Sequence, residues 1–73
     1  MATFAIVIER CGTGSYGAWS PDLLGCIAAA DDQDECLRLM QEAIEFHLEG
    51  MREDGEPMPE PSTVAVATFT TAA

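Results

Sequence analysis

SPDLLGC at residues 20–26 and DGEPMPEP at residues 54–61 are the two stretches that decide how this chain folds. Both are rich in proline, glycine and aspartate, which favour turns because they fix φ, permit positive φ or bond to their own backbone. Together they predict two strands, a third strand, a helix and a last strand along the 73 residues. A chain of this length makes one domain, residues 1–73, with a small core of its own.

Four segments have the composition of β-strands. Residues 3–8 (TFAIVI) are apolar on both alternating faces, which is typical of a central strand covered on both sides. Glycines at positions 12 and 14 predict a hairpin loop, after which residues 15–19 run back as a second strand. Residues 26–30 predict a short edge strand, and residues 63–69 predict a last strand because they are rich in β-formers.

One helix is predicted over residues 33–54. Asp32 is a good N-cap, and Glu35 three residues later completes a capping box. Apolar residues then recur at helical spacing, while glutamates occupy mostly the other side. Gly55 follows as a C′ residue, and Pro57 prevents the helix from continuing.

The resulting fold class is α+β with the order βββαβ. If the last strand pairs in parallel with the first, the connection through the helix is right-handed and the first strand lies inside the sheet. One helix covers one sheet face, so the other face is expected to expose residues such as Val7 and Phe69, or their alternates. Because such a face usually marks an interface, we expect a homodimer or a higher homo-oligomer.

The charge of the chain restricts its partners. Three basic and thirteen acidic residues give a formal charge of −10. This surface repels nucleic acid and anionic membranes and favours a basic protein partner, although acidity also serves solubility alone. The N-terminus lacks the basic region of an export signal and no apolar run is long enough to span a bilayer, so we expect a cytoplasmic protein with reduced thiols.

Catalytic chemistry has little support in the sequence. His47 is the only histidine and has no nucleophile at a spacing that forces contact, so a structural or solvent-facing role is favoured. Cys26 and Cys36 are interpreted as core residues, whereas Cys11 sits at a hairpin where a reactive thiol is possible. We expect no enzyme activity, no metal and no cofactor. Tyr16 and Trp19 flank the first loop, and one of them is a candidate interface anchor.

These residues resemble a HicB-type antitoxin domain, the partner of the small HicA-type ribonuclease toxin. The resemblance covers residues 4–69 and rests on three features: the aromatic-bearing second strand, the loop at residues 21–26, and the capped helix with its ending at residues 48–61. Ser20 stands where the family often has an aromatic residue, and Leu24 where it often has proline. The loop is therefore expected to be less rigid than in other members.

The resemblance implies a partly ribonuclease H-like βββαβ fold without catalytic acids. It also implies that the chain neutralises a small basic mRNA-cleaving toxin by masking its RNA-binding surface. Many members carry a C-terminal DNA-binding segment, which is not expected here because the chain stops after its last strand. The residues expected near the toxin, or steering it, are Tyr16, Trp19, Asp22, Leu23, Glu42, Glu45 and Glu49.

Two other classes of function stay open at this point. The first is an orphan oligomeric scaffold or small-ligand binder that has no toxin partner, supported by the missing DNA-binding segment and the altered loop. The second, and the least favoured, is an enzyme that depends on His47. The genes beside this one separate the first class from an antitoxin, because a toxin partner is expected next to its antidote.

Overall fold

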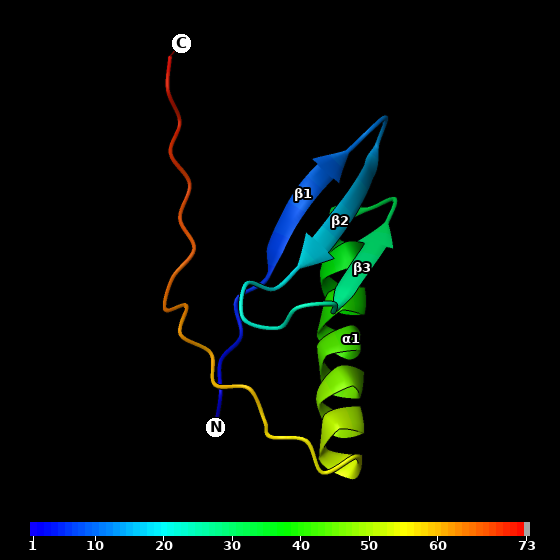
Figure 1. Ribbon diagram of the computed structural model, residues 1–73. Helices are drawn as coiled ribbons and strands as arrows, with labels where there is room; N and C mark the ends of the chain where they lie inside the picture. The colour runs from blue at the N-terminus through cyan, green and yellow to red at the C-terminus, as the bar shows by residue number, and fades with distance from the viewer. Residues whose placement is uncertain (73) are drawn as a thin grey trace.

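A computed structural model describes residues 1–72 of the chain. Within this range the chain forms three strands followed by one helix: β1 (Val7–Cys11), β2 (Ser15–Trp19), β3 (Ile27–Ala30) and α1 (Gln33–Glu53). The strands pair antiparallel in the order β1-β2-β3, and α1 packs against one face of this sheet (Figure 1). The α+β class and the order of the first four elements are therefore confirmed.

Local signals set the ends of these elements. Gly12 and Gly14 adopt positive φ values of 54° and 110° in the β1–β2 hairpin, a conformation that favours glycine. A carboxylate oxygen of Asp32 accepts a hydrogen bond from the Glu35 backbone N–H at 3.0 Å, so Asp32 is the N-cap of α1. At the other end Gly55 has φ 71°, and the backbone N–H of Glu56 donates to the Met51 carbonyl oxygen at 2.9 Å. This is the Schellman arrangement that ends a helix.

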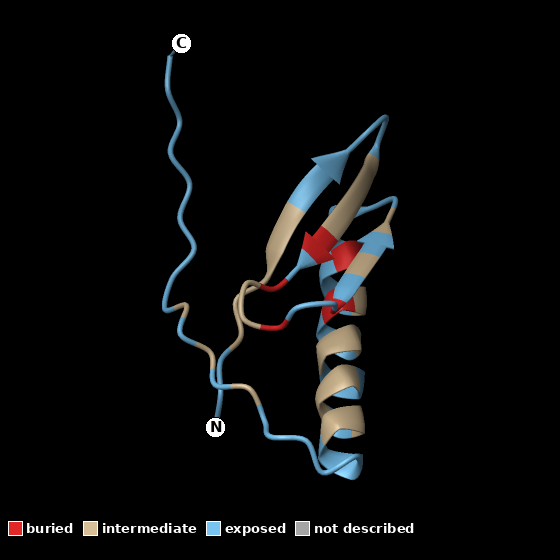
Figure 2. Ribbon diagram, viewed as in Figure 1, coloured by how far each residue is buried: buried red, intermediate tan, exposed pale blue. Residues whose placement is uncertain are grey.

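The core lies between the sheet and the first half of α1. Ala18, Leu23, Cys26, Cys36 and Met40 are buried, and Cys36 and Met40 have no exposed surface at all (Figure 2). The Cys36 thiol lies 3.6 Å from the Tyr16 carbonyl oxygen and ties the helix to β2. Cys26 and Cys36 are thus core residues, as their surroundings in the sequence predict.

Two expectations about the first strand are wrong. The strand begins at Val7 instead of residue 3, and it lies at an edge of the sheet, with β2 in the centre. The central position of β1 depended on a last strand beside it, and no such strand forms within residues 1–72. Residues 4–8, whose apolar pattern predicts a central strand, therefore have no strand on the edge that faces away from β2. The relation to a ribonuclease H-like sheet stays a prediction.

The segment after the helix has no regular secondary structure. Residues 57–63 run back past the N-terminal segment to the loop before β3, and residues 64–72 then extend away from the sheet (Figure 1). The radius of gyration is 13.9 Å, whereas a compact domain of this length has about 11 Å. The predicted strand over residues 63–69 does not appear, because these residues pair with no strand within residues 1–72.

Candidate partner-binding surface

The loop between β2 and β3 is held by its own backbone and by the core. The backbone N–H of Leu23 donates to the Ser20 carbonyl oxygen at 3.3 Å, and that of Cys26 donates to the Leu23 carbonyl oxygen at 3.4 Å. Leu23 is only 4% exposed and packs in the core, while Leu24 beside it is exposed. Leu23 therefore fixes the loop, and its side chain offers little surface to a partner.

Asp22 fastens the C-terminal segment to this loop. Its carboxylate accepts hydrogen bonds from the Thr63 backbone N–H at 2.9 Å and from the Ser62 hydroxyl at 3.2 Å. The hydrogen bond from the Thr63 backbone lowers the pKa of Asp22 below its ordinary value of 3.8, because it favours the ionised form. The main role of Asp22 in this structure is to join two segments that are 41 residues apart.

The two aromatic residues of β2 lie on opposite faces of the sheet. Tyr16 is half-buried and packs against the core on the helix side. Trp19 is 40% exposed and pairs in register with Val7 on β1 and Ile27 on β3. Since paired residues in a sheet point to the same face, these three side chains form an apolar row on the face that α1 leaves uncovered.

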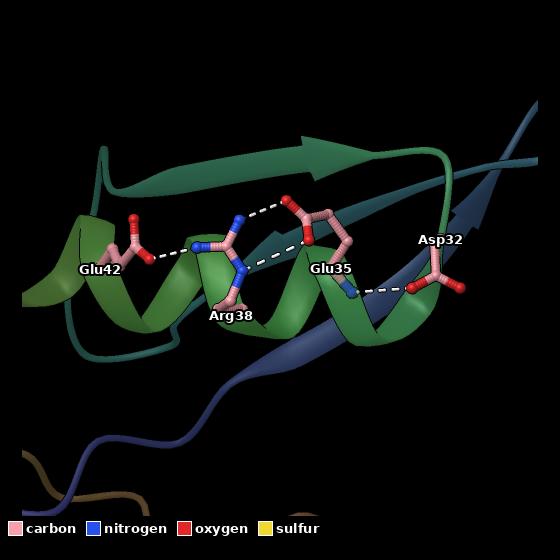
Figure 3. Close-up of polar contacts among 4 residues, drawn as sticks. All are labelled: Asp32, Glu35, Arg38 and Glu42. Carbon is pink, nitrogen blue, oxygen red and sulfur yellow. Dashed lines mark hydrogen bonds and ion pairs between the residues drawn. The ribbon is translucent and has the colours of Figure 1, made fainter.

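The predicted acidic residues line the outer side of α1. Glu42, Glu45, Glu49 and Glu53 are all exposed, and we call these four residues the acidic ridge. Glu42 forms an ion pair with Arg38, which also binds Glu35 (Figure 3). Glu35 thus pairs with Arg38 in addition to its backbone bond to Asp32. Glu45, Glu49 and Glu53 are exposed to solvent.

Phe46 is a surface residue that the sequence reasoning missed. Its side chain is 82% exposed and stands between the ridge glutamates. Together with Glu49, Gly50 and Glu53 it lines a hollow of about 250 Å³. Helical phase could have identified Phe46 as exposed, because position 46 falls outside the apolar stripe that continues through Ile44 and Leu48.

The predicted site residues do not form one surface. The Trp19 row lies on the open face of the sheet, whereas the acidic ridge lies on the outer side of α1, with the core between them. Asp22 is at the loop, bound to Thr63. The chain therefore offers two separate surfaces, one apolar and one acidic with an aromatic residue at its centre.

The described residues contain no cluster of side chains that suggests metal binding. No group of three or more His, Cys, Asp or Glu side chains within residues 1–72 is placed to hold a metal ion. His47 is half-buried on α1, and all three cysteines are free, with Cys11 exposed. Within residues 1–72, no helix is long and apolar enough to cross a membrane.

Comparison with known proteins gives a family and several relatives. A protein-family profile described as "HicB_like antitoxin of bacterial toxin-antitoxin system" matches residues 4–71. A UPF0150 protein of Archaeoglobus fulgidus is 46% identical over 55 residues, which cover 73% of this chain and 80% of the relative. A UPF0150 protein of Synechocystis is 30% identical over 56 residues, covering 77% of this chain and 71% of the relative.

A phage protein also matches over most of the chain. It is an uncharacterised 14.9 kDa protein of Haemophilus phage HP1, 39% identical over 61 residues that cover 84% of this chain. The match spans 45% of the phage protein, so this chain corresponds to about half of that relative. No solved structure matches the chain.

Proposed function

The chain belongs to the HicB-like antitoxin family of bacterial toxin-antitoxin systems, and from this we propose that it binds and neutralises a small basic HicA-type toxin that cleaves mRNA. The family match over residues 4–71 is the observation that carries the proposal. The chain acts by binding, without chemistry of its own. It competes with RNA for the basic surface of the toxin.

The charge of the chain supports this partner. A ribonuclease needs Lys and Arg to bind the phosphate backbone of its substrate. A protein with a formal charge of −10 is attracted to that same surface, and opposite charges accelerate encounter and reject wrong partners. The toxin therefore meets an acidic protein where it would otherwise hold RNA.

The acidic ridge is the surface that suits the proposed contact. Its carboxylates are exposed, and Glu45, Glu49 and Glu53 follow one another at spacings of four residues along α1. Phe46 adds an exposed ring beside Glu49, and an aromatic face attracts Lys or Arg side chains in addition to the carboxylates. We propose that ridge glutamates steer the toxin and that Phe46 contributes to holding it. Trp19, Tyr16 and Asp22 stay predicted contacts.

A toxicity assay tests the proposal. Cells that express a HicA-type toxin are supplied with this chain at excess, and growth is followed together with cleavage of a reporter mRNA. Restored growth and uncut mRNA are expected. Full toxicity with the chain present at excess contradicts the proposal, provided that the chain is shown to be folded by the helical circular dichroism signal of α1.

A second candidate is an oligomeric scaffold or small-ligand binder without a toxin partner. The apolar row at Val7, Trp19 and Ile27 favours it, because exposed apolar rows serve contacts that need no charge. The two candidates differ in one observation from the genome and one from the protein. A toxin gene beside this one and complex formation that weakens with salt support the antitoxin, whereas a stable homo-oligomer without any basic partner supports the scaffold.

A further inference from the structure

Three features on the same side of the molecule have no part in the proposed contact with the toxin. One is the outer edge of β1, the second is an apolar groove between the N-terminal segment and α1, and the third is the extended segment of residues 64–70, which we call the C-terminal arm. Each of them is incomplete alone. The arm has the composition of a strand, and the β1 edge and the groove form the place where such a strand would pair and pack.

The edge of β1 offers backbone groups without a strand beside them. β1 pairs with β2 on one side, and no strand of residues 1–72 pairs with it on the other. An open edge of this kind is a template for another strand, and proteins usually shorten, charge or cover it. The exposed charges on β1 are confined to Glu9 and Arg10, so the part that begins at Val7 has no such protection.

The groove lies where side chains of an added strand would point. Its volume is about 500 Å³, and Phe4 and Ile6 line it from the segment that enters β1. Ile44, Glu45 and Leu48 line it from the second half of α1, and Met58 and Pro59 line it from the segment that follows the helix. The helix packs mainly on β3 and β2 and only slightly on β1, so its apolar stripe extends past the sheet that should cover it. One more strand beyond β1 would cover this stripe.

The C-terminal arm has the composition of that strand. Val64 is 98% exposed and Phe69 is 91% exposed, while Val66 is also exposed. Val64 and Val66 lie on one face of an extended chain and Phe69 on the other, because side chains alternate. One face could therefore fill the groove, and the other could extend the apolar row that contains Val7 and Trp19.

The path of the chain favours a second copy as the arm's partner. The segment between α1 and Thr63 carries prolines at positions 57, 59 and 61. Prolines and the residues that precede them favour an extended backbone, which opposes a return of the chain on itself. Asp22 then holds Thr63, and beyond this tether the arm leads away from its own sheet (Figure 1). Two identical chains can exchange such an arm reciprocally, which covers both edges at once.

We propose that the C-terminal arm, residues 64–70, pairs with the β1 edge of a second copy of this chain and fills its groove with Val64 and Val66. The product is a symmetric dimer with two exchanged arms. Each half of the dimer then has a sheet of four strands, with β1 inside. This interface does not depend on a toxin, and it leaves Glu42, Glu49 and Glu53 of the acidic ridge exposed, whereas Glu45 lines the groove that the arm fills.

Isotope-filtered NMR on the full chain tests the exchange. Equal amounts of carbon-13-labelled and unlabelled chain are unfolded, mixed and refolded, and only contacts between differently labelled copies are recorded. We expect a mass of twice 7.8 kDa and contacts from the Val64 and Val66 methyl groups of one copy to Phe4 or Ile6 of the other. A monomer, or a dimer whose arm contacts only its own chain, would overturn the proposal.

Proline variants give a second, independent readout. Val66→Pro and Ala67→Pro remove neighbouring backbone N–H groups, and one of these points toward β1 because donors alternate along a strand. We expect at least one of the two to raise the dimer dissociation constant roughly tenfold or more, since a lost ladder bond costs more than about 1.4 kcal/mol. Val66→Thr keeps a β-branched shape and the N–H, and it should keep the dimer. Equal dissociation constants for all variants contradict the exchange.

Discussion

The carboxylate of Asp22 accepts a hydrogen bond from the backbone N–H of Thr63 at 2.9 Å, across 41 residues of chain. The loop before β3 and the segment after α1 are therefore joined by one side chain. Ser62 adds its hydroxyl to the same carboxylate at 3.2 Å. Position 22 thus decides where the C-terminal arm starts, whichever chain the arm finally contacts.

Removal of this carboxylate should free the arm without unfolding the domain. In Asp22→Ala the Thr63 amide loses its acceptor, and we expect its hydrogen exchange to accelerate by roughly tenfold or more, because local opening no longer breaks that bond. Amides of α1 should keep their protection. Asp31→Ala, another exposed acidic position, is the matched control and should leave Thr63 unchanged. Equal exchange at Thr63 in all three proteins would show that the tether is absent in solution.

The tether should weaken in acid. The hydrogen bonds from Thr63 place the pKa of folded Asp22 below its ordinary value of 3.8, so the folded state gains from ionised Asp22. This gain is fully present above the ordinary pKa and is lost as the pH falls through the lowered pKa of the folded protein. The amide shift and exchange rate of Thr63, followed by NMR during acidification, should report this loss. Asp22→Asn cannot titrate, and its Thr63 amide should show no transition in that range.

Ser20 is a place where a polar group is buried at a cost. Its side chain is 2% exposed, and its hydroxyl oxygen has no hydrogen-bond partner among residues 1–72. Because an unsatisfied buried hydroxyl costs about 1–3 kcal/mol, Ser20→Ala should raise the free energy of unfolding, by about 1 kcal/mol after the lost packing of one oxygen. Urea unfolding followed by circular dichroism measures this change.

A matched substitution separates burial from residue type. Ser62→Ala removes an exposed serine whose hydroxyl donates to Asp22, so it should lower stability slightly or leave it unchanged. A loss of stability in Ser20→Ala would show that the hydroxyl has a partner in solution.

The elements predicted best from the sequence are those whose signals are local. Asp32 and Gly55 mark the ends of α1, and both signals need only a few neighbouring residues to act. The glycines of the hairpin likewise place the turn between β1 and β2. The second and third strands follow because turns fix where they can start, and pairing with a neighbour along the chain is the simplest arrangement.

The last strand could not be predicted in the same way. Residues 63–69 have strong β-propensity, yet propensity describes a residue's fit to a sheet and supplies no neighbour. The prediction that β1 is central failed for the same reason. The apolar pattern on both of its faces predicts that the strand is covered, but it does not identify the segment that covers it. At the candidate site, the exposure of Glu42, Glu45 and Glu49 followed from helical phase. The tether at Asp22 did not, because it joins segments that are distant in sequence.

The three cysteines should react at different rates. Cys11 is exposed, whereas Cys26 and Cys36 are buried in the core. Burial also raises the pKa of the Cys26 thiol, which lowers the fraction of the reactive thiolate. We expect one thiol per folded chain to react quickly with a thiol reagent and all three to react in denaturant. Cys11→Ser should abolish the fast phase. A fast phase that persists in this variant would mean that the core opens readily.

The acidic ridge gives the prediction that bears most directly on the proposed antitoxin role. Glu49→Lys reverses a charge beside Phe46, so it should slow association with a basic toxin and weaken the dependence of that rate on salt. Glu9→Lys makes the same change in net charge on β1, away from α1, and is the matched control. Stopped-flow fluorescence with the purified toxin measures both rates. If the ridge guides the encounter, Glu49→Lys has the larger effect; equal slowing would mean that only net charge matters and would remove the ridge as the docking surface.

Phe46→Ala separates holding from steering on that same ridge. The ring carries no net charge, so the association rate should change little. Dissociation should become roughly fivefold to thirtyfold faster, because an aromatic anchor that contacts a cation typically contributes about 1–2 kcal/mol. Leu24→Ala removes an equally exposed apolar side chain from the loop and should leave both rates unchanged. Since Phe46 is exposed in the free protein, Phe46→Ala should also leave the free energy of unfolding within about 0.5 kcal/mol of the parent, so a change in toxin dissociation cannot be attributed to unfolding.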